Sequence, residues 1–198
     1  MAEVTIENIK KLRDATGAGM MDAKAALTEA KGDFDKAVEL MRLKGIAKAG
    51  KKADRVASNG VVQSYVHGEK IGVLVEINCE TDFVARTEDF KTFARDIAMH
   101  IAATNPTYLS SETVDPKALK KETETIKKEV LASGKPAEFA DKMVEGKLKK
   151  WYEQVCLLEQ PFIKDDSKTI DELTKEVIGK LGENIVIKRF SRLELGVE

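Results

Sequence analysis

The stretch from Ile71 to Cys79 alternates with a period of two, and it constrains the fold more than any other feature. One face would carry Ile71, Val73, Val75, Ile77 and Cys79, and the opposite face Leu74, Glu76 and Asn78. A period of two is that of a β-strand, and this pattern indicates a strand in a sheet buried on one side. The run Val61–His67 is also β-rich, and only a short turn at Gly68-Glu69 intervenes. The sequence therefore predicts a β-hairpin.

A helix should cover the apolar face of this hairpin. The apolar residues Phe90, Phe93, Ala94, Ile97, Ala98, Ile101 and Ala102 recur with helical spacing and form a wide stripe. Near the C-terminus, Thr169 and Glu172 match a capping box before an apolar-striped helix that ends at Gly182. The segment Asn184–Phe190 then reads as a closing strand that could join the hairpin.

The N-terminal segment predicts three short helices. Thr5 can cap the first helix and Gly17 ends it, while Asp33 can cap the third. The second helix lies between Gly19 and Gly32, and its expected core contacts are Met21, Ala25 and Leu27. About forty residues form a small module near the lower limit for independent folding. The stretch from Lys44 to Arg55 suits an exposed helix or linker, which favours a domain boundary near residue 55.

The segment from Asp115 to Pro161 predicts two highly charged helices. Asp115 can cap the first, Pro116 takes its first position, and Gly134-Lys135-Pro136 breaks the chain between the two helices. Their apolar stripes are narrow, so we expect a protruding helical hairpin that buries mostly its own seam.

The predicted fold class is α+β, with an antiparallel-sheet core covered by helices and two helical additions. Its domains would be a three-helix segment with its basic linker at 1–55, a core at 56–114, a helical hairpin at 115–160, and a core helix with a closing strand at 161–198.

The amino-acid composition argues against some classes of binding partner. The 33 basic and 34 acidic residues give a net charge of −1, which argues against a long-range positive field for nucleic acid. The basic stretch Lys44–Arg55 has no interleaved aromatics, so a solvated linker is favoured over a nucleic-acid patch. No segment resembles a secretory signal or a membrane span, so we expect a cytoplasmic protein. Cys79 and Cys156 should then be reduced thiols, a disulfide between subunits being the alternative.

No catalytic motif is present in the sequence. The patterns GxxxxGK[ST], GxGxxG and GxSxG are all missing, and His67 and His100 are the only histidines. Cys79 could be paired with a histidine as nucleophile and base, but a cysteine at a core-facing strand position is usually a small hydrophobe. We expect a protein that is not an enzyme and needs no metal or cofactor.

Two apolar pairs remain to be explained. Thr81-Asp82-Phe83-Val84, the TDFV turn, places two apolar side chains where a strand-to-helix connection should be polar. Phe83 could be a hydrophobic staple for the next helix or an aromatic anchor for a partner, and the pattern alone leaves both open. Met20 and Met21 are adjacent and cannot share one helix face, so one can pack inward while the other is exposed for contact with a partner.

Several longer segments carry a resemblance that covers the whole chain. They are "TGAGMMDAKAALTEAKGDFDKAVELMR", "HGEKIGVLVE", "NCETDFVA", "IAMHIAA", "SGKP", "KMVEGKLKKW" and "QPFIKDDSKTI". Together they resemble the bacterial elongation factor Ts family, from the first helix to the final strand.

This resemblance implies a guanine nucleotide exchange factor for elongation factor Tu that has no chemistry of its own. The N-terminal helices would form a ubiquitin-associated-like module that docks on the GTPase domain. Its contact candidates are Lys10, Arg13, Met20 and Met21.

The same resemblance assigns the TDFV turn, Thr81, Asp82, Phe83 and Val84, to disturbing the partner's Mg²⁺ site, with the Phe83 ring as a wedge. His67, Gly182 and Glu183 are weaker contact candidates. The predicted helical hairpin matches the coiled-coil hairpin of the family.

One departure from the family pattern concerns the core. The long form carries two related core halves and this chain carries one, which implies a homodimer with two Tu molecules. Two other readings stay open: a helical binding module for ubiquitin-like or nascent-chain partners, and RNA binding through Lys44–Arg55.

Overall fold

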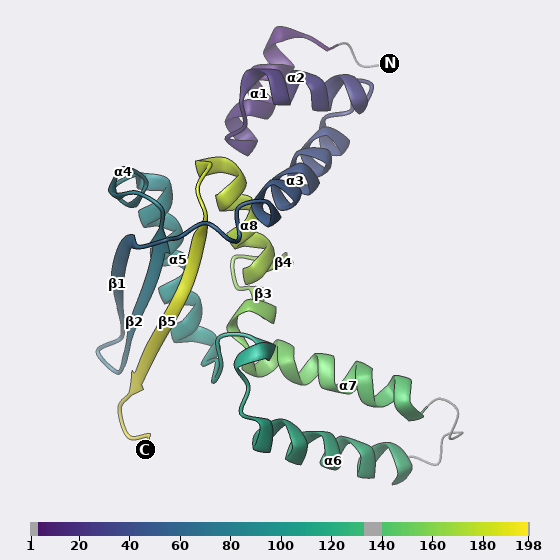
Figure 1. The fold of residues 1–198 in the computed structure, drawn as a ribbon, viewed down its shortest axis with the longest axis vertical. Coiled ribbons are helices and arrows are strands. Elements are labelled where there is room, and N and C mark those ends of the chain that lie inside the picture. The colour runs from purple at the N-terminus through teal and green to yellow at the C-terminus, as the bar shows by residue number, and fades with distance from the viewer. Residues whose placement is uncertain (1–3, 133–139, 198) are drawn as a thin grey trace. The chain divides into compact units, whose positions relative to one another are not determined.

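The computed structural model describes residues 4–132 and 140–197. The chain divides into two compact units, each assembled from separated segments. The first unit contains the residues up to Val62 together with Glu76–Ala94 and Glu172–Lys188, and the second contains Gln63–Val75, Arg95–Asp171 and the residues from Arg189 onwards. Figure 1 labels the elements, and the fold is α+β, as predicted.

Three helices open the first unit: α1 (Ile6–Thr16), α2 (Met20–Glu29) and α3 (Phe34–Gly50). The predicted caps are confirmed, because the Thr5 and Asp33 side chains accept hydrogen bonds from the backbone N–H groups of Asn8 and Lys36. Gly17 ends α1 with a left-handed φ of 66°, which a residue without Cβ adopts easily. The shared core of the three helices contains Ile9, Leu12, Ala23, Ala26, Leu27, Ala30, Ala37 and Met41.

Two expectations for α2 were wrong. Met21 and Ala25 are exposed, and the buried positions beside Leu27 are Ala23 and Ala26. Met20 and Met21 are 39% and 77% exposed, so neither packs fully inward. The sequence of α2 has alanines on several sides, and apolar spacing alone therefore could not identify the buried face.

The α3 helix includes much of the basic stretch, for which the sequence allowed either an exposed helix or a linker. Lys44 and Lys48 form ion pairs with Glu29 and Asp22 of α2, at 2.7 and 2.8 Å. Both lysines therefore have acidic partners on the neighbouring helix.

The sheet contains β1 (Asn59–His67), β2 (Ile71–Cys79) and β5 (Ile185–Glu194) in the order β1-β2-β5. Gly68 and Glu69 make the hairpin turn, with φ values of 55° and 61°. The closing strand joins the hairpin beside β2, as predicted. It runs antiparallel to β2, because Asn184 at its start bonds to Glu80 and Leu195 beyond its end bonds to Lys70.

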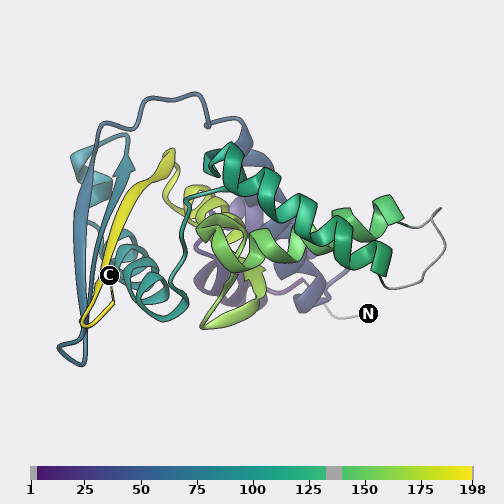
Figure 2. The ribbon, with the colours of Figure 1, turned by 90° about the horizontal axis from the view of Figure 1, so that it is seen from below.

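The predicted faces of β2 are confirmed. Val73, Val75, Ile77 and Cys79 are buried, while Leu74 on the other face is 53% exposed. The helix α5 (Glu88–Thr104) lies along the buried face of the sheet (Figures 1 and 2), and every residue of its predicted apolar stripe is buried.

The second unit contains the two charged helices α6 (Pro116–Ala132) and α7 (Ala140–Val155). Asp115 accepts a hydrogen bond from the Lys117 N–H at the start of α6, as predicted. The two helices pack against each other (Figure 2). The predicted break at Gly134-Lys135-Pro136 lies outside the described residues.

Short elements flank the two charged helices. The 3₁₀ helix η1 (Ser111–Thr113) precedes α6, and the 3₁₀ helix η3 (Leu157–Glu159) follows α7. A two-stranded antiparallel sheet of β3 (Pro161–Phe162) and β4 (Asp165–Thr169) comes next. The sequence interpretation did not include this small sheet.

The last helix, α8 (Ile170–Leu181), ends at Gly182, where φ is 80°. In the first unit α8 passes very close to α3: a Cβ at Gly179 would lie 2.9 Å from the Cα of Gly45. Across the described ranges, none of the helices combines the length and hydropathy needed to cross a bilayer.

Candidate functional site

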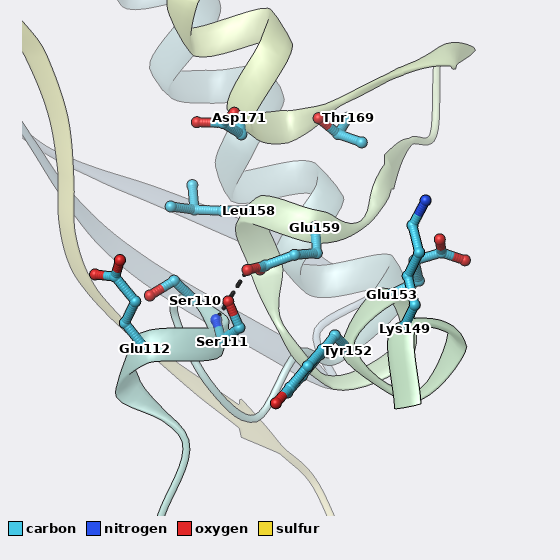
Figure 3. A pocket seen from close by; sticks show the side chains of 10 residues that line it. All are labelled: Ser110, Ser111, Glu112, Lys149, Tyr152, Glu153, Leu158, Glu159, Thr169 and Asp171. Atoms are coloured by element: carbon cyan, nitrogen blue, oxygen red, sulfur yellow. Dashed lines mark hydrogen bonds between the residues drawn. The ribbon is translucent and has the colours of Figure 1, made fainter. Parts of the chain in front are cut away.

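A pocket of about 430 Å³ lies in the second unit (Figure 3). Its charged lining residues are Glu112, Glu153, Glu159, Asp171 and Lys149, and hydroxyl groups complete most of the wall. The backbone N–H of Ser111 donates to Glu159 Oε1 at 2.9 Å. None of the site residues expected from the sequence lines this pocket.

The TDFV turn lies in the first unit, between β2 and α5. Its residues form the one-turn helix α4 (Asp82–Ala85), and Thr81 is the N-cap, accepting a hydrogen bond from Val84 N at 3.4 Å. Phe83 is 79% exposed, Val84 is half-buried, and Ala85 points into the core. The staple interpretation of Phe83 is therefore wrong, since a staple would be packed against the following helix.

Asp82 has a local partner. Its carboxylate forms an ion pair with Arg86 at 2.9 Å, one helical turn later. This pair is largely exposed, so it contributes at most about 1 kcal/mol to stability. Asp82 stays accessible beside Phe83.

Thr81 makes several hydrogen bonds that fix the start of the turn. Its backbone N–H and its hydroxyl both donate to the Glu183 carboxylate, at 3.0 and 2.6 Å. Its carbonyl accepts from the Cys79 thiol at 3.1 Å. Glu183, named on resemblance as a partner contact, is therefore engaged inside this protein.

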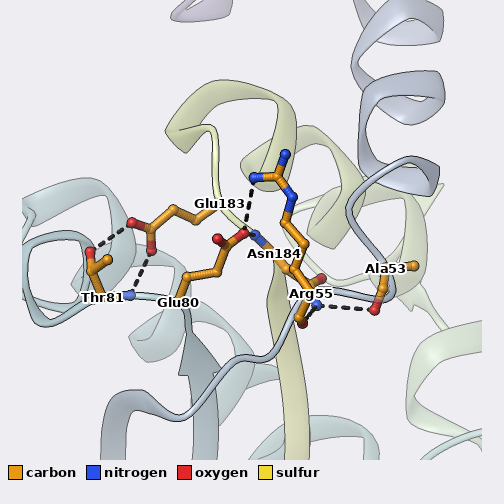
Figure 4. A network of polar contacts seen from close by, with 6 residues as sticks. All are labelled: Ala53, Arg55, Glu80, Thr81, Glu183 and Asn184. Atoms are coloured by element: carbon orange, nitrogen blue, oxygen red, sulfur yellow. Dashed lines mark hydrogen bonds and ion pairs between the residues drawn. The ribbon is translucent and has the colours of Figure 1, made fainter.

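A second carboxylate lies beside the first (Figure 4). Glu80 accepts from the backbone N–H of Asn184 at 2.7 Å and pairs with Arg55 at 3.6 Å. The amide of Asn184, which is 4% exposed, donates to the carbonyl oxygens of Ala53 and Arg55. This network joins the segment after α3, the end of β2 and the start of β5.

The two carboxylates affect the pKa values of Lys52 and Cys79, which lie near them. Burial lowers the pKa of Lys52, an effect that Glu80 and Glu183 oppose. Burial also raises the pKa of the Cys79 thiol, and the Glu183 charge adds to this shift. Cys79 and Cys156 are both buried free thiols, and burial raises the pKa of Cys156 to about 11.

The other candidates in the first unit are exposed. Lys10 and Arg13 lie on α1, where Arg13 pairs with Asp14 at 2.6 Å, and Met20 and Met21 open α2. Gly182 is exposed at the end of α8. The first unit thus contains every candidate except His67.

His67 belongs to the second unit, at the end of β1. It is exposed, and its Nδ1 lies 3.2 Å from the Tyr65 hydroxyl. His100 is fully buried and bonds to Gln160. His100 is therefore a packed core residue, whereas His67 is accessible on the hairpin.

Sequence reasoning missed Glu80 and Asn184. Glu80 directly follows β2 and Asn184 directly precedes β5. Polar residues beside a strand are common, so their positions in the sequence did not indicate a hydrogen-bond network. Within residues 4–132 and 140–197, no three carboxylate, imidazole or thiolate side chains come together as metal ligands.

Comparison of the sequence with known proteins places the chain among the translation elongation factors. The sequence model of the family described as "Elongation factor TS" matches residues 2–197. Elongation factor Ts of Carboxydothermus hydrogenoformans is 57% identical over 98% of this chain and 89% of its own length. The proteins of that name from Acetivibrio thermocellus and Alkaliphilus oremlandii are 56% and 53% identical, each over 98% of this chain and 90% of their own length. The chain belongs to the elongation factor Ts family.

Proposed function

We propose that this protein is a guanine nucleotide exchange factor that binds elongation factor Tu and promotes GDP release by disturbing the Mg²⁺ and phosphate site of Tu. Family membership supports the partner. The observation that carries the mechanism is Phe83, a large aromatic side chain that is 79% exposed on a turn fixed by hydrogen bonds. Aromatic side chains that become buried when a partner binds dominate the binding energy of many interfaces.

Displacing a metal ion is enough for this task. Mg²⁺ demands near-ideal octahedral geometry, so a small movement of its ligands weakens the hold on the nucleotide. Accelerating release about ten-thousandfold requires only about 5.5 kcal/mol off the barrier. The coupling is reciprocal, so nucleotide rebinding expels the factor. The protein itself needs no catalytic acid, base or cofactor.

The three-helix module of α1–α3, which we expect to be ubiquitin-associated-like, would supply a second contact. Lys10, Arg13, Met20 and Met21 are all exposed on its first two helices. Methionine side chains adapt to irregular partner surfaces, and the two cations supply charge. Two contacts on one partner raise the effective affinity above that of either alone.

The proposed assembly is a homodimer that carries two Tu molecules. In the second unit, Val66, Leu74 and Leu193 are exposed on three neighbouring strands, on the face opposite α5. Arg192, next to Leu193, donates to the Ala102 carbonyl of α5, which gives the orientation of this part of β5. A second copy could cover this apolar face.

The proposed setting is the cytoplasm, with no membrane or direct nucleic-acid partner. The two lysines of the basic stretch that pair with α2 favour protein recognition over RNA binding. Steep loss of RNA retention with added salt would support the RNA alternative instead.

The decisive experiment measures release of fluorescent GDP from Tu at limiting factor. Phe83→Ala should fold normally, because the side chain is exposed, and should slow release at least about tenfold. Val197→Ala is a matched control, since it truncates another exposed apolar side chain, and should behave like the unmodified protein. If the unmodified protein fails to accelerate release, the binding-module alternative replaces this proposal.

A further inference from the structure

We propose that Glu183 is a positioning residue that fixes the orientation of Phe83 through Thr81, and that it makes no contact of its own with the partner. This inference rests on the proposed exchange function. It gives Glu183 a role different from the one that family resemblance suggested.

The hydrogen bonds of Thr81 carry the inference. Both oxygens of the Glu183 carboxylate accept from Thr81: Oε2 from the backbone N–H at 3.0 Å, and Oε1 from the hydroxyl at 2.6 Å. The Thr81 carbonyl accepts from Cys79 Sγ at 3.1 Å and from the Ala85 N–H at 3.3 Å. Every polar group of Thr81 is therefore engaged, and Phe83 follows two residues later.

The turn needs such external support. The α4 helix has four residues, far fewer than an isolated helix needs to be stable in water. An exposed Phe83 contributes little packing energy to keep the turn in one conformation. The two charge-assisted bonds from Glu183 to the N-cap supply this restraint, because bonds to an ionised acceptor are stronger than neutral ones.

Glu183 is itself fixed in place. It follows Gly182, where α8 ends with a left-handed φ of 80°, and it precedes the buried Asn184. Asn184 bonds to Glu80, Ala53 and Arg55, as Figure 4 shows. The Glu183 carboxylate is therefore attached next to a hydrogen-bonded residue, and each of its two oxygens accepts a bond from Thr81.

The restraint from Glu183 would set the fraction of molecules in which Phe83 has the orientation that binds Tu. If the restraint is lost, Phe83 points in the productive direction for only a fraction of the time. The apparent affinity for Tu falls by that same fraction, because only the competent conformation binds. Removing the restraint should therefore weaken binding to Tu only when the Phe83 side chain is present.

The experiment is a double-mutant cycle on GDP release. Glu183→Gln removes the charge that strengthens both bonds, and Thr81→Val removes the hydroxyl bond to Glu183 together with the N-cap bond from Val84 N. Each should slow release by between about tenfold and a hundredfold. In a Phe83→Ala background, assayed at higher factor concentration, each should add no more than about a twofold effect. Thr81→Ser keeps the hydroxyl and should restore most of the rate. Glu124→Gln on α6 controls for the loss of one negative charge.

Different outcomes overturn different claims. If Glu183→Gln slows release equally in the Phe83→Ala background, Glu183 contacts the partner directly and the positioning role is wrong. If Phe83→Ala slows release and neither Glu183→Gln nor Thr81→Val does, the positioning role alone fails. If Phe83→Ala has no effect, the proposed wedge mechanism fails. Melting temperatures identify any variant that has simply unfolded. If Glu183→Gln or Thr81→Val unfolds the protein, the double-mutant cycle with the other of these two substitutions tests the positioning role.

Discussion

At the scale of single residues, His100 shows how a buried polar group is satisfied. Its Nδ1 accepts from the Ile163 N–H at 3.3 Å, so its Nε2 carries the proton and donates to Gln160 Oε1 at 3.0 Å. The Thr104 hydroxyl donates to the same Gln160 oxygen at 2.8 Å. Burial lowers the pKa of His100, an effect that the Gln160 bond opposes. The neutral imidazole is therefore part of the folded structure.

This histidine predicts a pH dependence of stability. Because the folded-state pKa is below the unfolded value of about 6.5, the unfolded chain binds the proton more readily. The stabilisation is complete above that value and is lost as the pH falls below it. The urea midpoint of unfolding should be lower at pH 5.5 than at pH 7.5.

The matched control for this prediction is His67→Gln, which removes the exposed histidine and should leave the difference between the two midpoints in place. His100→Asn should reduce that difference. Equal midpoints at the two pH values for the unmodified protein would contradict the prediction.

At the scale of elements, α8 connects the three-helix module to the turn. It meets α3 at Gly45 and Gly179, and Lys180 pairs with Asp89 of α5 at 2.7 Å. Arg42 of α3 and Glu172 of α8 are 3.7 Å apart. Glu183 follows the same helix, so the position of α8 affects both proposed contacts with Tu.

The close approach of α3 and α8 predicts the effect of one added methyl group. Gly179→Ala places a Cβ 2.9 Å from the Gly45 Cα, and the backbone there can give way only if a helix moves. We expect a loss of about 1 to 3 kcal/mol in the free energy of unfolding. This corresponds to a melting temperature lower by several degrees.

Gly146→Ala is the matched control, because it makes the same change in α7 where a new Cβ meets no neighbour within 4 Å. It should stabilise by up to about 1 kcal/mol, since glycine disfavours a helix interior. A Gly179→Ala variant as stable as this control would show that the two helices can separate freely.

At the scale of the whole molecule, one face of the three-stranded sheet is covered and the other is exposed. The face toward α5 is buried, while the outer face carries exposed valine and leucine side chains. An exposed apolar face of this kind is typical of an interface. It is the structural feature behind the proposed homodimer.

The dimer proposal predicts the result of adding charge to this face. Leu74→Asp combined with Leu193→Asp should raise the dimer dissociation constant about a hundredfold or more, because burying each leucine is worth about 2 kcal/mol. Sedimentation equilibrium, with and without reductant, measures this constant. Leu131→Asp on α6 is the control and should leave it unchanged. A monomeric unmodified protein would contradict the proposal.

Local patterns in the sequence were sufficient for most of the elements and for the faces of β2 and α5. The alternation of β2, the stripe of α5 and the caps at Thr5, Asp33 and Gly17 were all predicted, because each depends on neighbours a few residues away. The choice between a staple and an anchor for Phe83 could not be made this way. It depends on whether a distant surface covers the ring.

The tertiary structure alone decided what surrounds the candidate site. The bond between Thr81 and Glu183 joins residues 102 positions apart, and no periodicity predicts such a pair. The burial of Ala23 in place of Met21, and the pairing of Lys48 with Asp22, likewise depend on how separate helices pack. The sequence by itself determined most of the helices, the hairpin with its closing strand, and the motif that carries Phe83, but not the small sheet of β3 and β4. Only the folded chain determined that Phe83 is exposed and which residue holds its turn, because long-range contacts arise from packing and not from local spacing.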